Sequence, residues 1–254
     1  VQKYGGSSVG DAEKIKAVAR RICRAKGDGS SVVAVVSAMG DTTDDLILLA
    51  NQIAGTPDPR ELDLLLSTGE LVSCTLLAMA IRSFGHEAVS LSGFQAGIRT
   101  DSKHGQARIA TVETDRIQEL LDEGKLVIVA GFQGVTEGMD VTTLGRGGSD
   151  TTAVALAAVL GARRCEIFTD VEGIYTADPQ VVPQAKKLGE IDYEEMLEPA
   201  NYGAKMHPRS IELGAVYNVP IYVSSSFTDV LGTLIRKGVK QDMEQRVKVT
   251  GITY

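Results

Sequence analysis

Uninterrupted runs of apolar, mostly β-branched residues recur along this chain and alternate with segments of helical periodicity. The runs within SVVAVVSAMG (residues 31–40) and KLVIVAGFQG (125–134) have no alternating polar positions. Strands of this kind are covered on both faces, as they are in parallel sheets. Their alternation with helices predicts an α/β fold, a three-layer αβα sandwich with a largely parallel central sheet. With 254 residues, the chain can bury such a core as one large domain or as two lobes.

The remaining elements are predicted from periodicity and from capping residues. Asp11 is expected to cap an amphipathic helix that runs to about Lys26. A long helix over 60–83 is expected to break at Ser67-Thr68-Gly69, where small polar residues interrupt an apolar pattern. The apolar face of the first helix would consist of Ile15, Val18, Ala19 and Ile22. The other predicted elements are strands over 1–4, 87–93, 164–170, 219–225 and 232–236, a hairpin over 98–112, and helices after residue 41, over 116–123, within 141–158, over 192–198 and over 204–217.

Composition argues against several classes of partner. The 26 basic and 33 acidic residues give a net charge of −7, and there is no Trp, so we expect no nucleic-acid partner. No apolar stretch looks long enough to span a bilayer, and the first residues lack a secretory apolar region, so we expect no membrane partner and a cytoplasmic location. The three cysteines lie far apart without a CxxC pair, so we expect reduced thiols in the core and no metal bound by protein ligands.

Two glycine-rich corners follow predicted strands near the start of the chain. No P-loop and no GxGxxG follows the first strand, but Lys3 stands beside Gly5, Gly6 and Ser7. A lysine next to turns that let the backbone close on a ligand suits phosphate oxygens, although a glycine pair alone more often marks a turn, here one that follows a solvated lysine. At the second corner, Ser37 and Thr43 are candidates for ligand contact because ligands gather beyond the carboxyl ends of parallel strands. The neighbouring Asp41 is interpreted as a helix cap.

The third corner is TTLGRGGSDTTA (142–153), a glycine turn that leads into a helix. The helix N-terminus there is a potential anion site, and Arg146 adds a planar fork able to bind a carboxylate or phosphate in bidentate fashion. The alternative is an exposed Arg146 on a loop, with Ser149 simply capping the helix, and both interpretations stay open on this motif alone.

Other polar residues stand out by their surroundings. Glu70 lies in an apolar helical segment, where a buried carboxylate must be paired or bound to a ligand. FTDVEGIYTADP (168–179) is a plausible nucleoside loop or, more simply, an Asp-rich turn. His207 precedes Pro208 and is explained equally well by a structural role.

Seven motifs in order resemble the aspartate kinases, a branch of the amino-acid kinase family, from Val1 to about Ile235. STGE and LGRGGSD together favour this branch over the sister kinases that act on acetylglutamate, glutamate or UMP. The motifs are KYGGSSV (3–9), VVSAMGDTTD (35–44), LLSTGELVS (65–73), AGFQGV (130–135), TTLGRGGSDTTA (142–153), FTDVEGIYTADP (168–179) and GAKMHPRS (203–210).

The resemblance implies an amino-acid kinase-like fold and transfer of the γ-phosphoryl group of ATP, with Mg²⁺, to the side-chain carboxylate of L-aspartate. That reaction is the first step toward lysine, threonine and methionine. By the same resemblance Lys3 and Asp150 are catalytic, with Asp150 orienting Lys3 or the metal. The implied substrate residues are Ser37, Thr43, Glu70, Arg146, Gly147 and Ser149. The implied ATP-binding residues are Lys3, Gly5, Gly6, Ser7, Thr169, Asp170, Tyr175, Asp178 and Lys205.

The resemblance also implies a domain organisation. Residues 1–236 would form the catalytic domain, with a substrate lobe over about 1–160 and a nucleotide lobe over about 161–236. The segment 237–254 is interpreted as a linker and the first strand of a regulatory ACT region, or else as an edge strand. A homodimer or higher oligomer is expected from the family.

Two positions depart from the family pattern. Gln180 stands where the family usually has Arg, which would remove a phosphate contact, and Pro199 stands where a helix-friendly residue is commoner. A sister kinase with another acceptor and a non-catalytic nucleotide-binding subunit are therefore the alternative functions.

Overall fold

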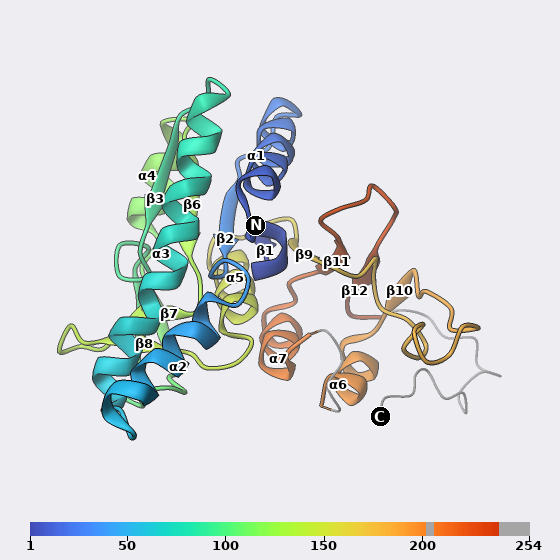
Figure 1. Cartoon of the computed structure of the whole chain (residues 1–254). Coiled ribbons are helices and arrows are strands. Elements are labelled where there is room, and N and C mark those ends of the chain that lie inside the picture. Colours follow the sequence, from blue (N-terminus) through green and yellow to red (C-terminus); the bar gives the residue numbers. More distant parts are fainter. Residues whose placement is uncertain (202–205, 239–254) are drawn as a thin grey trace.

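The structure is a computed structural model that describes residues 1–201 and 206–238 (Figure 1). The predictions for Lys205 and for a further strand in 239–254 lie outside these residues. The strands are β1 (Gln2–Tyr4), β2 (Val33–Val36), β3 (Ala88–Leu91), β4 (Ile98–Thr100), β5 (Ile109–Val112), β6 (Leu126–Ala130), β7 (Gln133–Val135), β8 (Val141–Thr143), β9 (Cys165–Thr169), β10 (Glu190–Ile191), β11 (Ile221–Ser225) and β12 (Thr233–Ile235). The helices are the 3₁₀ helix η1 (Gly6–Val9) and the α-helices α1 (Ala12–Gly27), α2 (Thr42–Ala54), α3 (Pro59–Ser83), α4 (Asp115–Asp122), α5 (Gly148–Val159), α6 (Tyr193–Asn201) and α7 (Pro208–Tyr217).

The described strands form one large sheet and one small sheet. The large sheet has eight strands in the order β10-β12-β11-β9-β1-β2-β6-β3. Its six strands from β11 to β3 run parallel, whereas β12 is antiparallel to β11 and pairs in parallel with β10. The predicted three-layer α/β fold with a largely parallel central sheet is therefore confirmed.

Alternation along the central strands divides the core into two layers. Val33 and Val35 of β2 face a cluster that includes residues of α4, α5, α6 and α7, together with Cys165. Ala34 and Val36 face the opposite cluster, which α1 and α3 cover and which contains Cys74. The absence of polar positions in this strand thus has a direct cause, since both of its faces are covered by helices. Figure 1 shows α3 at the left and α1 at the top of the molecule, with α6 and α7 below the centre.

The small sheet has four strands in the order β5-β4-β7-β8. The hairpin predicted over 98–112 is present as the antiparallel pair β4 and β5. Strands β7 and β8 form a second antiparallel pair, and β7 joins the first hairpin by a parallel contact with β4. This second hairpin was not predicted from the sequence, although it carries the start of the 142–153 motif.

Most helix predictions are confirmed, but two details are wrong. Asp11 caps α1 by accepting a hydrogen bond from Lys14 N at 2.8 Å, and the four predicted apolar residues are the buried ones. Asp41 occupies the N-cap position of α2, yet its side chain makes no capping hydrogen bond. The predicted break at 67–69 does not occur: α3 is continuous there, and Ser67 Oγ and Thr68 Oγ1 donate to the carbonyls of Leu64 and Leu65 in the preceding turn.

Helix α3 also corrects the expectation that no stretch could span a bilayer. It has 25 residues and a mean hydropathy of 1.8 over its most apolar window, which is long and apolar enough by composition. Half of that window is buried inside the protein, and α3 packs on α1, β3 and β6. A buried core helix has the same length and composition as a membrane span, so α3 is weak evidence for a membrane.

Two adjacent leucines of α3 test this core role. Leu77 is completely buried, whereas Leu76 is 38% exposed. We expect Leu77→Ala to lower the free energy of unfolding by about 2–5 kcal/mol, because it leaves a cavity in the core. The matched Leu76→Ala should cost less than about 1 kcal/mol. Urea denaturation measures both, and equal losses would contradict the assignment of this helix face to the core.

Candidate active site

The carboxyl ends of the central parallel strands meet at one edge of the large sheet. In the strand register, Tyr4 pairs with Val36 and Phe168, and Val36 pairs with Ala130. The segments that follow these four residues therefore lie together: Gly5–Ser7, Ser37–Gly40, Gly131 and Thr169–Asp170. This edge is where open α/β sheets bind their ligands.

Lys3 lies in β1 and forms an ion pair with Asp150 of α5. Alternation along β1 places Gln2 and Tyr4 on one side of the sheet, where Tyr4 Oη donates to Gln2 Oε1, and turns Lys3 toward the other side. Lys3 Nζ is 2.7 Å from Asp150 Oδ1, and the side chains are only 12% and 9% exposed. Asp150 Oδ1 makes no hydrogen bond to the other described residues, so the contact is electrostatic. Asp150 thus holds a nearly buried ammonium at the ligand edge.

Glycines allow the N-terminus of α5 to approach the sheet. Gly147 is the N-cap residue with φ +70°, and no side chain caps the helix there, so the interpretation of Ser149 as a simple cap is wrong. A Cβ on Gly131 would lie 2.8 Å from Ser149 Cβ and 2.9 Å from Val35 Cγ1. Any larger residue at 131 would therefore push α5 away from the end of β6. An open helix N-terminus beside a lysine can hold the anionic oxygens of a phosphoryl group.

The turns after β1 and β2 pack directly against each other. Gly40 N donates to Gly6 O at 3.1 Å, and a Cβ on Gly6 would lie 2.7 Å from Ala38 O. Gly5 is partly exposed beside Lys3, and Ser7 is exposed. Ser37 and Thr43 are half-buried on the neighbouring turn and on α2. The structure thus brings these predicted site residues to the same edge as Lys3.

Glu70 is buried at this edge and only partly satisfied. Its Oε1 accepts a hydrogen bond from Ala38 N at 3.2 Å, whereas Oε2 is buried and has no hydrogen-bond partner in the described structure. Gly69 allows this approach, since a Cβ there would lie 2.9 Å from Ala38 Cβ. Burial raises the pKa of Glu70 from 4.5 to about 7, opposed only in part by the Ala38 hydrogen bond. Within residues 1–201 and 206–238 this carboxylate has no positively charged partner.

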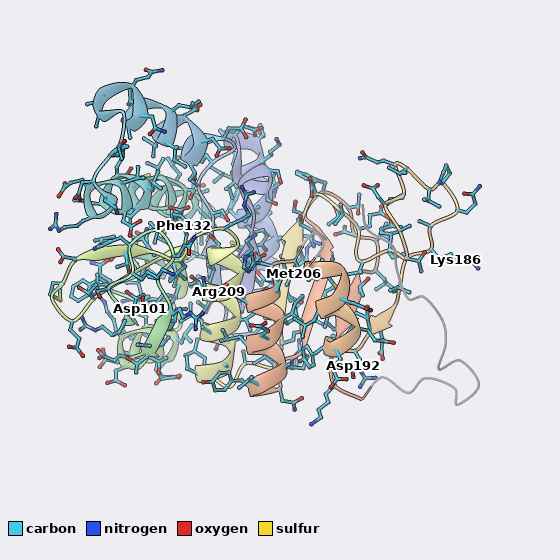
Figure 2. The ribbon with its side chains drawn as sticks, turned by 90° about the horizontal axis from the view of Figure 1, so that it is seen from below. Asp101, Phe132, Lys186, Asp192, Met206 and Arg209 are labelled. Atoms are coloured by element: carbon cyan, nitrogen blue, oxygen red, sulfur yellow. The ribbon has the colours of Figure 1, made fainter. Side chains whose placement is uncertain are left out.

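Arg146 is exposed on the loop between β8 and α5. It lines an open cavity of about 900 Å³ that β5, α5 and α7 also border. Arg209 of α7 fixes the start of this loop, because its Nη1 donates to Leu144 O at 2.7 Å. Its Nη2 donates to Ala107 O, before β5, at 3.0 Å. Figure 2 shows Arg209 between Asp101, beside the small sheet, and Met206, just before α7. Arg146 is thus an available guanidinium beside the N-terminus of α5.

The predicted nucleotide residues lie at the end of β9 and on the long segment before β10, which projects at the right of Figure 1. Thr169 Oγ1 donates to the exposed Asp170 at 3.0 Å. Tyr175 Oη donates to Glu172 at 3.4 Å. Asp178 Oδ1 accepts from Gln180 N at 2.7 Å, so this residue shapes a turn. Thr169 and Asp170 share the edge with Lys3, whereas Tyr175 and Asp178 are partly buried farther along the segment.

The structural explanation of His207 is confirmed. His207 is the N-cap of α7, and its Nδ1 accepts a hydrogen bond from Arg209 N at 3.3 Å. Burial and the neighbouring Arg209 lower the pKa of His207, which favours this accepting, neutral ring. The helix begins at Pro208 rather than at 204, because proline suits the first helical position. Met206 and His207 thus precede the helix.

Phe132 is a feature that the sequence did not reveal. It lies between β6 and β7 with φ +68°, a conformation that costs free energy for a bulky residue. Phe132 O accepts from Leu144 N at 2.8 Å, and Phe132 N donates to Thr152 Oγ1 at 3.3 Å. The strained backbone of Phe132 therefore bonds to the 142–153 motif on both sides of its glycine turn, at Leu144 and at Thr152. Its only signal in the sequence is its place after Gly131.

The comparisons with known proteins agree with this geometry. Residues 1–225 match the amino acid kinase family, and the chain belongs to that family. It is 55% identical over 255 residues to the aspartokinase of Geobacillus stearothermophilus, covering 100% of this chain and 62% of that protein. Aspartokinase 2 of Bacillus subtilis (strain 168) is 53% identical, with 100% and 62% covered. The chain thus spans less than two thirds of the length of these relatives.

Solved structures extend the comparison. Aspartate kinase from Synechocystis superposes with a TM-score of 0.83 at 49% identity, over 95% of this chain and 40% of that chain. E. coli aspartokinase III, solved in complex with aspartate and ADP, gives 0.83 at 30% identity, over 94% and 65%. UMP kinase from Bacillus anthracis gives 0.69 at 18% identity over 94% and 95%, which shows the shared fold alone.

Removing the charge of Glu70 should stabilise the protein without ligand. The folded state holds a proton on Glu70 up to about pH 7, whereas the unfolded state releases it near 4.5, so the folded state loses stability as the pH rises between these values. We expect Glu70→Gln to raise the free energy of unfolding at pH 8 by up to about 3 kcal/mol, and far less at pH 5. An amide can still accept from Ala38 N.

Urea denaturation at the two pH values measures this effect. Glu137→Gln, at an exposed acidic residue in the turn between β7 and β8, is the matched control and should show no such gain. A Glu70→Gln protein that is less stable than the wild type at pH 8 would show that Glu70 has a charged partner in the ligand-free protein.

Proposed function

We propose that the protein is an aspartate kinase, which transfers the γ-phosphoryl group of ATP to the side-chain carboxylate of L-aspartate and releases 4-phospho-L-aspartate and ADP. The similarity to aspartokinases at 53–55% identity over the whole chain supports this proposal. So does the likeness to E. coli aspartokinase III, whose structure contains aspartate and ADP.

The observation that carries the choice of acceptor is Glu70. Its buried Oε2 has no hydrogen-bond partner in the described structure, and a buried carboxylate of this kind is stabilised by a cation. L-Aspartate carries an α-ammonium group that fits this requirement, as does glutamate, whereas acetylglutamate and UMP have no free amine. Binding the ammonium would favour the ionised form of Glu70. The site therefore selects an amino acid with a free amine.

The reaction asks for alignment and charge compensation more than for covalent chemistry. Phosphoryl transfer brings two anions together, and fixed cations lower the energy of the transition state. Lys3 would bind the β- and γ-phosphate oxygens, and Asp150 would hold its ammonium in position through the 2.7 Å ion pair. The acceptor carboxylate is ionised at neutral pH, so no general base is needed.

The remaining substrate contacts are assigned by position. Arg146 would clamp a carboxylate of aspartate, because its guanidinium is exposed beside the open N-terminus of α5. Ser37, Thr43 and Gly147 would line the aspartate side. Ser149, which is held against Gly131, would contact the transferring group.

The nucleotide would lie across the turns after β1 and β9. Gly5, Gly6 and Ser7 would line the phosphates, while Thr169, Asp170, Tyr175 and Asp178, together with Lys205, would hold the nucleoside and phosphates. Gln180 is exposed, and its backbone N–H donates to Asp178. Its uncharged amide side chain would be a weaker phosphate partner than the arginine usual in the family.

Mg²⁺ would enter with ATP as part of the substrate. No group of three or more His, Cys, Asp or Glu side chains that could bind a metal occurs among residues 1–201 and 206–238. A magnesium ion that accompanies ATP is usually held by phosphate oxygens, water and only one or two protein carboxylates. Asp150, beside Lys3, is the carboxylate best placed to face it.

The wider setting is proposed from the family. The enzyme would act in the cytoplasm in the synthesis of lysine, threonine and methionine, and would form a dimer or higher oligomer. Residues 1–236 would be the catalytic domain, with a substrate lobe over about 1–160 and a nucleotide lobe over about 161–236, followed by a regulatory ACT region.

Trapping the acyl phosphate with hydroxylamine tests the proposed reaction. We expect ATP-dependent formation of aspartyl hydroxamate from L-aspartate, because hydroxylamine attacks the phosphorylated carboxyl group. Glutamate and acetylglutamate, whose acyl phosphates would also be trapped, are the control acceptors and should give no hydroxamate. Hydroxamate from one of these acceptors but not from aspartate would identify a sister kinase. ATP binding without hydroxamate from any acceptor and without release of ADP would identify a non-catalytic subunit.

Arg146 provides a second test, which separates the two substrates. We expect Arg146→Ala to raise the KM for aspartate roughly a hundredfold, because a carboxylate of the substrate would lose its bidentate guanidinium partner. The KM for ATP should change by less than about threefold. Steady-state kinetics with each substrate varied in turn measures both constants. Equal changes would show that Arg146 does not bind the acceptor.

A further inference from the structure

Asp63 is a buried carboxylate to which the proposed reaction gives no part. It lies on α3 and is only 1% exposed. Donors from two other segments converge on its oxygens. They are His104 Nδ1 at 2.9 Å, Gly105 N at 3.0 and 3.1 Å, Thr143 N at 3.0 Å and Thr143 Oγ1 at 2.6 Å. A carboxylate only accepts, so Nδ1 carries the proton of the His104 contact. Asp63 thus connects the core helix to both hairpins of the small sheet.

The partners of Asp63 support the loop that carries Arg146. Thr143 ends β8, three residues before Arg146, and its carbonyl accepts from Ala107 N at 2.9 Å. Gly145 packs against Gly105, the other backbone donor to Asp63, since a Cβ on Gly145 would lie 2.9 Å from Gly105 O. Movement of Thr143 or Gly105 would therefore shift the backbone beside Arg146.

We propose that Asp63 is a positioning residue that fixes the Arg146 loop in the conformation that binds the acceptor. The inference rests on the proposed role of Arg146. Buried charge-assisted hydrogen bonds are strong and directional, so one carboxylate with donors on two segments holds them in a single arrangement. A misplacement of a binding group by about 1 Å is enough to reduce turnover severely.

The chain contains a matched control for this contact. Arg60 Nε donates to Asp140 at 2.7 Å and also links α3 to the hairpin of β7 and β8. That ion pair is largely exposed, with side chains 50% and 40% accessible, and exposed pairs contribute little to structure. Asp140→Asn removes a charge from the hairpin of β7 and β8, which also contains Thr143, without altering the buried contact between Asp63 and Thr143.

The test compares Asp63→Asn with Asp140→Asn in the full chain. We expect Asp63→Asn to raise the KM for aspartate about tenfold, the effect of losing one charge-assisted hydrogen bond, with the KM for ATP nearly unchanged. Asp140→Asn should leave both constants unchanged. Thr143→Val, which removes one donor only, should act in the same direction if Asp63→Asn fails to fold, and Thr143→Ser should restore the wild-type value.

Coupling to Arg146 distinguishes positioning from general support. In the Arg146→Ala background, Asp63→Asn should add little to the KM for aspartate, because the group that it positions is already gone. Fully additive effects, or equal changes in both KM values, would overturn the proposal.

Hydrogen exchange separates this inference from the proposed function. We expect the amides of residues 141–147 to exchange faster in Asp63→Asn than in Asp140→Asn, whether or not aspartate is the acceptor. Unchanged exchange there would refute the anchoring role. Absence of hydroxamate with the wild-type protein, together with faster exchange in the variant, would refute only the proposed reaction.

Discussion

A nearly buried lysine in the middle of a parallel sheet is the constraint around which the rest of the molecule is arranged. An ammonium that is nearly buried against the helix-covered face of a sheet needs a negatively charged partner. For Lys3 that partner is Asp150, at 2.7 Å. That contact requires the first turn of α5 to lie against β1 and against Gly131, which follows β6, and it requires glycine at 131 and 147. The strands, the turn and the helix N-terminus therefore depend on one another, and together they form one anion-binding edge.

The sequence predicted the elements whose pattern is local. Strand β2 was evident because both of its faces are covered, and α1 because its cap and apolar face repeat within a few residues. The continuity of α3 was not predictable in the same way, since the small polar residues that suggested a break sit within the helix, where Ser67 and Thr68 donate to carbonyls of the preceding turn and Gly69 packs against Ala38. Strand β7 escaped prediction because only Gly131 and Phe132 separate it from β6, so the two strands form one apolar run, and β8 because it leads directly into a glycine-rich motif that indicates a turn.

In the candidate site, too, the residues with a local sequence signal were predicted and those that depend on distant contacts were not. Lys3 was found because it stands at the end of a predicted strand beside glycines, and Glu70 because it is a charged group in an apolar helix. Phe132 was missed because its backbone conformation depends on contacts with Leu144 and Thr152, which are distant in the sequence. Asp63 was missed because a carboxylate near the start of a helix looks exposed until its partners at 104, 105 and 143 are known.

The unbroken helix α3 sets a fixed spacing within the site. Asp63 and Glu70 are seven residues apart, which in an α-helix places them on the same face and roughly 10 Å apart along the axis. Inserting or deleting one residue between them would turn one carboxylate away from its partners by about 100°. Evolution can therefore exchange side chains along this segment, but we expect its length to be invariant in any protein that uses both carboxylates in this way.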